Sequence, residues 1–230
     1  MSQGAANPGV TTQNSLPIRA IFAGDYAAAD EGSYFTSWQA ATANTATATT
    51  TQALATTSPS LVIFNGNAAG GYNMYLRYVK VEITAITTGM TTAEHVGVLN
   101  SGSIHTTTGT LMSTPVNVNG ASGTGSLAVL YGGVNVCSTP AAAARIVHTG
   151  TITNSIPIVL DTWTLAYGEP MSNSNLIGTM TLVKNITVPV PPVIIPPRTY
   201  YTLGFWGASW NGAASTYRLN VGWIERPSGQ

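Results

Sequence analysis

The sequence predicts an all-β fold, an antiparallel β-sandwich or a related barrel, on three observations. Stretches in which apolar and polar residues alternate recur along the chain, as in strands that have one face in a core and one in solvent. Clusters of glycine, asparagine and serine, which favour turns, separate these stretches at intervals of about ten residues. No stretch carries the apolar periodicity of a long amphipathic helix.

The expected strands begin at Tyr34. The clearest covers residues 79–87, where valine and isoleucine alternate with lysine, glutamate and threonine, and the aromatic-rich residues 73–78 lead into it. The run 60–65 is almost wholly apolar until a turn signal at residues 65–67, which is typical of a central strand buried on both faces. Shorter strands are expected at 96–99, 127–131, 162–167 and 179–183.

Two later segments complete the predicted sheets. Residues 198–206 and 217–225 alternate again, and Asn211-Gly212 between them favours a hairpin. The proline-rich segment 188–197 lacks donors for a strand ladder, so we expect it at a sheet edge or as a connection pressed on the core. The Ala/Thr-rich residues 40–55 are interpreted as a surface strand pair or loop.

Residues 1–32 differ from the rest and are expected to form an extended N-terminal arm, with residues 33–230 as the sandwich domain. The arm carries one short apolar patch. Its residues Ile18, Ile21 and Phe22 are the candidate contact with a neighbouring subunit or a larger assembly.

Charge is unusually scarce. Only 7% of the 230 residues are charged, against about 25% in an average protein, and the net charge is zero. A surface of hydroxyl and amide groups is cheaper to desolvate than one of charges, which suits a protein that packs against copies of itself or a larger assembly. Scattered single basic residues argue against nucleic acid and against an anionic membrane as partners. No apolar span of membrane length and no export signal is found, so synthesis in a cytoplasm is expected.

Catalytic and metal-binding patterns are not found in the sequence. His95 and His105 flank a predicted loop and could approach each other, but with His148 they show no zinc-ligand spacing. The acids Asp25, Asp30 and Glu31 lack the pattern of a calcium loop. No nucleophile elbow or phosphate loop occurs, and no carboxylate pair is distinctive. We therefore expect no enzymatic activity and no cofactor or metal ion.

The single cysteine and the C-terminal aromatic residues have structural interpretations. Because Cys137 is the only cysteine of the sequence, no intrachain disulfide can form. Cys137 is expected to be a small buried apolar residue. The aromatic residues between 200 and 223 are expected in the core or at a subunit contact, although exposed rings could also stack on sugars. Trp210, with Asn211 at the tip of the predicted hairpin, is the candidate exposed contact.

The chain resembles the small jelly-roll structural proteins of tailed bacteriophages, over residues 34–226. The resemblance is carried by residues 34–44 running into the Ala/Thr tract, by the strand 60–65, by Pro196-Pro197 before Tyr200-Tyr201, and by the final strand ending at Glu225. It implies a jelly roll, a homotrimer on the capsid surface of the virion, the major capsid protein as partner and a decoration or cement role. It implies no catalytic residues, and the arm would be the strap to the shell.

Two other functions remain open. A receptor-binding or glycan-binding module of a tail or head fibre would use the aromatic contact at Trp210. A shell-forming coat protein is the third possibility, but a coat faces packaged nucleic acid, and Arg19 is the only basic residue in the arm.

Overall fold

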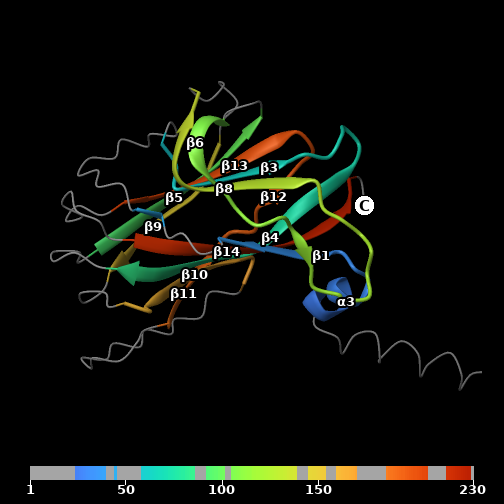
Figure 1. The fold of residues 1–230 in the computed structure, drawn as a ribbon, viewed down its shortest axis with the longest axis horizontal. Coiled ribbons are helices and arrows are strands. Elements are labelled where there is room, and N and C mark those ends of the chain that lie inside the picture. Colours follow the sequence, from blue (N-terminus) through green and yellow to red (C-terminus); the bar gives the residue numbers. More distant parts are fainter. Residues whose placement is uncertain are drawn as a thin grey trace, which may run out of the picture.

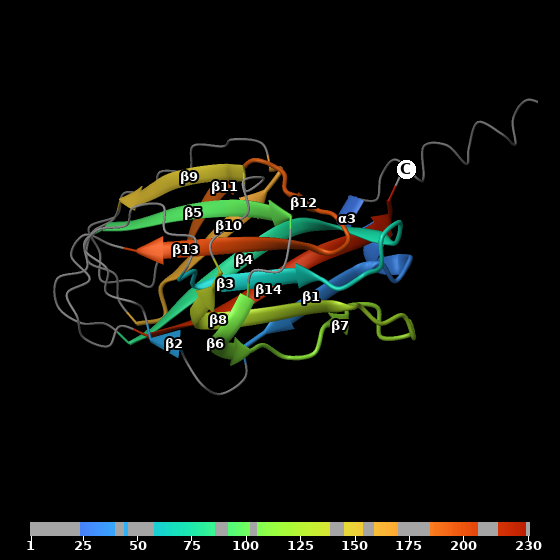
Figure 2. The same cartoon turned by 90° about the horizontal axis from the view of Figure 1, so that it is seen from above.

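The computed structural model describes residues 24–39, 44–45, 58–85, 92–101, 105–138, 145–153, 159–169, 185–206 and 216–228. Within these residues the chain forms two β-sheets packed face to face (Figures 1 and 2). The predicted all-β sandwich is therefore confirmed.

The first sheet has eight strands. Six lie side by side in the order β11 (Asn185–Val190), β10 (Thr162–Tyr167), β4 (Tyr72–Ala85), β14 (Thr216–Pro227), β1 (Tyr34–Trp38) and β7 (Val116–Asn117). Two short strands complete it: β12 (Ile194–Ile195) pairs with β4, and β2 (Asn44–Thr45) pairs with β14. All its strand pairs are antiparallel except β10 with β11. The proline-rich segment thus supplies an edge strand, as expected, because Pro189 lies in β11.

The second sheet has six strands, all antiparallel to their neighbours. Their order is β6 (His105–Leu111), β8 (Ala128–Cys137), β3 (Leu61–Asn65), β13 (Thr199–Trp206), β5 (Thr92–Ser101) and β9 (Arg145–Thr153). The prediction of a central buried strand at 60–65 is confirmed, since Leu61, Val62 and Ile63 in β3 are all fully buried.

The predicted C-terminal hairpin is wrong. β13 and β14 have the expected alternation, but β13 belongs to the second sheet and β14 to the first. Both place alternate apolar side chains in the same core, for example Leu203 and Leu219, from opposite sides. The alternating pattern identifies a strand with one core-facing side, and it does not say in which of two sheets that strand lies. The proposed hairpin tip and the expected strand at 179–183 lie outside the described residues.

A short helix corrects the picture of the arm. Residues Gly24–Asp30 form α3, where an extended arm and no helix were expected. The run Ala27 to Ala29 favours helix, and the acidic Asp25 in the first turn complements the helix dipole. Ala28 is fully buried, so tertiary packing stabilises a helix too short to persist alone. The rest of the arm, residues 1–23, lies outside the described part of the chain.

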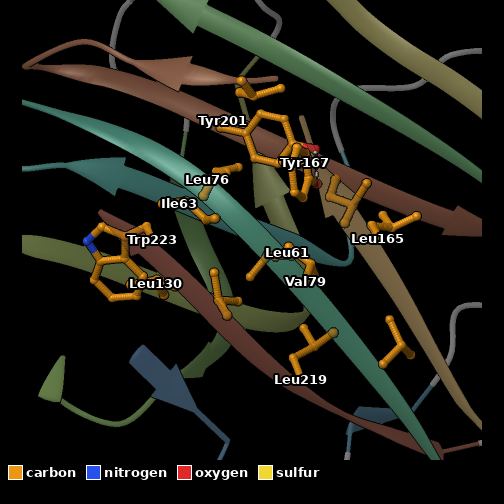
Figure 3. Close-up of a cluster of buried hydrophobic side chains, with 14 of the residues drawn as sticks. Leu61, Ile63, Leu76, Val79, Leu130, Leu165, Tyr167, Tyr201, Leu219 and Trp223 are labelled. Carbon is orange, nitrogen blue, oxygen red and sulfur yellow. Dashed lines mark hydrogen bonds between the residues drawn. The ribbon is translucent and has the colours of Figure 1, made fainter. Parts of the chain in front are cut away.

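One apolar core fills the space between the sheets (Figure 3). Its largest fully buried side chains come from both sheets and include Trp163, Trp223, Tyr167 and Tyr201. Phe35 stacks on Trp223 with ring centroids 6.1 Å apart. Each large apolar side chain buried in this way contributes roughly 1.5–3 kcal/mol to folding, before losses of conformational entropy. Most of the C-terminal aromatic residues that the structure describes therefore belong to the core.

Candidate functional site

Helix α3, at the C-terminal end of the predicted arm, is fastened to the sandwich by an ion-pair cluster. Arg77 on β4 places its Nε 2.8 Å from Oδ1 of Asp25 in α3, and its Nη2 3.1 Å from Oε1 of Glu169, just after β10. These side chains are partly exposed, so each pair is worth at most about 1 kcal/mol. The guanidinium nevertheless fixes the orientation of α3 by bridging it to two strands of the first sheet.

Hydrogen bonds to the chain after α3 add to this fastening. Ser33 donates from Oγ to the Ala28 carbonyl at 3.0 Å, and Asn119 donates from Nδ2 to the Asp30 carbonyl at 3.0 Å. The backbone N–H of Glu225 in β14 donates to the Ser33 carbonyl at 2.8 Å. We call α3, with these bonds and the Arg77 ion pairs, the arm anchor. Figure 1 shows it beside β1 at one end of the sandwich.

The second notable cluster is a buried histidine pair. His95 on β5 and His148 on the neighbouring β9 face the core, with ring centroids 5.3 Å apart. His148 Nε2 lies 2.8 Å from the Tyr201 hydroxyl, which lies 2.7 Å from the Tyr167 hydroxyl. Because Tyr167 belongs to β10, this chain of polar groups crosses from the second sheet to the first, and Figure 3 shows the two tyrosines meeting.

Two glycines make room for the imidazole rings. A Cβ added at Gly97 would lie 2.2 Å from His148 Nε2, and a Cβ added at Gly150 would lie 2.7 Å from His95 Nε2. A Cβ atom, which cannot hydrogen-bond, does not approach a ring nitrogen so closely without repulsion, so any other residue would displace a ring. Each glycine lies directly opposite a histidine on the neighbouring strand, Gly97 opposite His148 and Gly150 opposite His95, which makes the close packing of β9 on β5 possible.

Burial sets the protonation state of the histidine pair. His95 and His148 are 2% and 7% exposed, and among the described residues both nitrogens of His95 and Nδ1 of His148 have no hydrogen-bond partner. Desolvation lowers the pKa of each from 6.5 to about 4, and for His148 the neighbouring His95 adds to the effect. Burial also raises the pKa of Tyr167 and Tyr201 well above the usual 10. All four groups are therefore neutral at pH 7.

The expected approach of His95 to His105 is wrong. His105 starts β6 at the far edge of the second sheet, with β8, β3 and β13 between it and β5. There its ring stacks on Tyr131 with centroids 4.0 Å apart. A loop between two strands brings their side chains together only if the strands pair, and these two do not.

Asp25 and Cys137 have structural roles. Asp25 is paired with Arg77, and within the described residues no group of three histidine, cysteine, aspartate or glutamate side chains could hold a metal ion. Cys137 is buried as predicted, and burial raises the pKa of its thiol to about 11. Its thiol is therefore protonated and inert at neutral pH.

The sequence-predicted contact residues lie outside the described residues: Ile18, Ile21, Phe22, Trp210 and Asn211. Among the described residues, three aromatic side chains that the sequence did not single out are exposed: Tyr26, Tyr72 and Trp38, the last 41% exposed at the end of β1. Its backbone is held by Ser113, whose N–H donates to the Trp38 carbonyl at 2.8 Å. The alternation of β1, with Phe35 facing the core, was the available signal, but it leaves open which outward residues stay uncovered.

The described helix is not of a kind that could cross a membrane. No protein-family model, curated protein or solved structure matches the chain.

Proposed function

We propose that this protein is a virion structural protein, a decoration or cement subunit on the capsid surface of a tailed bacteriophage. Its partners would be further copies of itself and the major capsid protein, and its role would be structural rather than catalytic. The observation that carries the proposal is the arm anchor. An arm that is fastened at its base to two strands and a loop can transmit attachment to the whole sandwich.

We also propose that the sandwich is a jelly roll, and the pairing of its strands supports this. Eight strands pair in a nested order: β1 with β14, β3 with β13, β4 with β10, and β5 with β9. First pairs with last, second with seventh, third with sixth and fourth with fifth, as in a long hairpin rolled into two Greek keys. β6, β7 and β8 are an insertion between the two innermost strands, β5 and β9. Jelly rolls occur in capsid proteins and lectins, so the fold is compatible with the proposal without selecting it.

The scarcity of charge supports attachment to a protein shell. A subunit that binds the assembled shell but not the free shell proteins stabilises the shell by mass action. A surface of threonine, serine and asparagine loses little hydration energy on contact and can make many hydrogen-bonded, partly wet contacts. Charged groups would add a larger desolvation cost to each contact.

Deleting residues 2–23 tests the proposal and leaves the arm anchor in place. We expect the variant to bind shells that lack this protein about tenfold or more weakly than the full chain, equivalent to about 1.4 kcal/mol. Its melting temperature should be unchanged, because Ala28 and Asp25 keep their contacts. Co-sedimentation with shells and circular dichroism measure the two effects. Equal binding would reject the arm as the attachment, and failure of the full chain to bind any shell would reject the function.

A glycan-binding module is the second candidate, and the exposed Trp38 favours it. Exposed aromatic faces stack on sugar rings, and the ring of Trp38 is available. If this function holds, Trp38→Ala or Trp210→Ala should abolish retention on a glycan array without lowering the melting temperature. Tyr72→Ala removes another exposed aromatic side chain and is the control for nonspecific adsorption to the array. Wild-type protein that binds no glycan would remove this candidate.

A further inference from the structure

The two sheets have four edges, and three of them carry features that discourage pairing with another strand. β11 contains Pro189, which cannot donate to a ladder, and β7 is only two residues long. β6 is irregular, with two register shifts against β8 and with Thr108 and Gly109 at φ of 60° and 79°. Proline, short length and bulges are the devices by which edge strands avoid association with other chains.

The fourth edge, β9, is open. Within the described part of the chain, β9 has β5 on one side and no strand on the other (Figure 2). It is nine residues long, contains no proline, and its only charged residue is the first, Arg145. One bulge occurs near Val147, and from His148 to Thr153 the register with β5 is unbroken. Six consecutive residues, about 20 Å, therefore present a regular row of backbone donors and acceptors.

This open edge is also held rigid from within. His148 packs against Gly97 of β5 and bonds to Tyr201 of β13, so the middle of β9 is fixed to the core. On the outer side, Thr149 is exposed and Ile146 is 52% exposed. A strand already fixed in its extended conformation loses little further entropy when another strand pairs with it.

We propose that β9 pairs antiparallel with β9 of a second copy of this chain, joining two six-stranded sheets into one continuous sheet. A two-fold axis makes such an edge self-complementary, and the other edges of the second copy are protected. Antiparallel pairing centred near residue 150 places the two Arg145 residues at opposite ends, roughly 35 Å apart, so no like charges oppose each other. Outward β-branched side chains such as Thr149 pair well across strands. The pairing does not depend on attachment to a capsid, and it predicts two chains rather than the three that the bacteriophage resemblance implies.

Molar mass by light scattering after gel filtration, over a range of concentrations, tests this contact. We expect a species of two chains for the wild type. Thr149→Lys places two ammonium groups near the two-fold axis and should weaken the dimer roughly tenfold or more. Thr107→Lys, at an exposed threonine of the protected edge β6, is the matched control and should leave the mass unchanged. A wild-type monomer or trimer, or a Thr149→Lys dimer as tight as the wild type, would overturn the proposal.

Hydrogen exchange keeps the test decisive if the lysine variant does not fold. Diluting wild-type protein below its dissociation constant should speed exchange of amides in residues 148–153 and leave β6 unchanged. Exchange in β9 that is independent of concentration would contradict the contact.

Discussion

At pH 5 the protein is expected to be clearly less stable than at pH 7.5, with the loss beginning near pH 6.5. The histidine pair is neutral in the fold, with the pKa of each ring lowered to about 4, whereas histidines of the unfolded chain titrate at 6.5. Between these values the unfolded state binds protons that the folded state does not, so the free energy of unfolding falls as the pH falls. The expected loss is about 2 kcal/mol for each histidine between pH 7.5 and 5.

Urea denaturation at several pH values between 5 and 7.5 measures this loss. His95→Leu removes one of the two titrating rings, and this ring has no hydrogen-bond partner in the described part of the chain, so the variant should lose about half of the pH dependence. His105→Gln is the control, because His105 is outside the core and should leave the dependence intact. If His95→Leu and the wild type respond equally to pH, the pair is not the source.

Replacing Glu225 by alanine is expected to destabilise the fold by roughly 3 kcal/mol or more. This carboxylate is 7% exposed near the end of β14. It accepts a hydrogen bond from Trp223 Nε1 at 2.9 Å and another from the Ser126 hydroxyl. Alanine would leave the fully buried indole N–H without an acceptor and a cavity beside it.

The free energy of unfolding from urea titration at pH 7.5 measures this effect. Glu225→Gln keeps an acceptor oxygen for Trp223 and should cost distinctly less than alanine. Glu169→Ala removes a partly exposed carboxylate that contacts Arg77 and should change stability by less than about 1 kcal/mol. If Glu225→Ala lowers the free energy of unfolding no more than Glu169→Ala does, the hydrogen bonds that Glu225 accepts from Trp223 and Ser126 do not stabilise the fold.

Strands could be predicted where their apolar residues alternate with polar ones or form a short continuous run. β4 and β10 were predicted because their apolar residues alternate or cluster, and β3 because it is apolar throughout. β6 gave no such signal, since all but one of its side chains are exposed. Local sequence patterns do not say which strands pair with each other. The wrong prediction that β13 and β14 form a hairpin has this cause. α3 was missed because seven residues are too few for a helical period to be seen.

The candidate sites depend on contacts between distant parts of the chain. Asp25 was noticed as an acid, but its partner Arg77 lies on a strand that the sequence does not place near it. His95 and His148 meet because β5 pairs with β9, although the β6–β8 insertion separates these strands along the chain. Gly97 and Gly150 could have suggested close packing, since glycine weakens a strand without some such reason.

The position of β14 has a consequence for biosynthesis. β14 is the last strand of the described chain, yet it lies between β4 and β1, two of the earliest. Until residues 216–227 have left the ribosome, β1 and β4 lack their shared neighbour, and the nascent protein carries two unpaired strand edges. Folding of the first sheet must therefore wait until β14 has emerged, and it is slow because its pairings connect strands far apart in the chain. Polypeptides that terminate before residue 216 should accumulate in inclusion bodies.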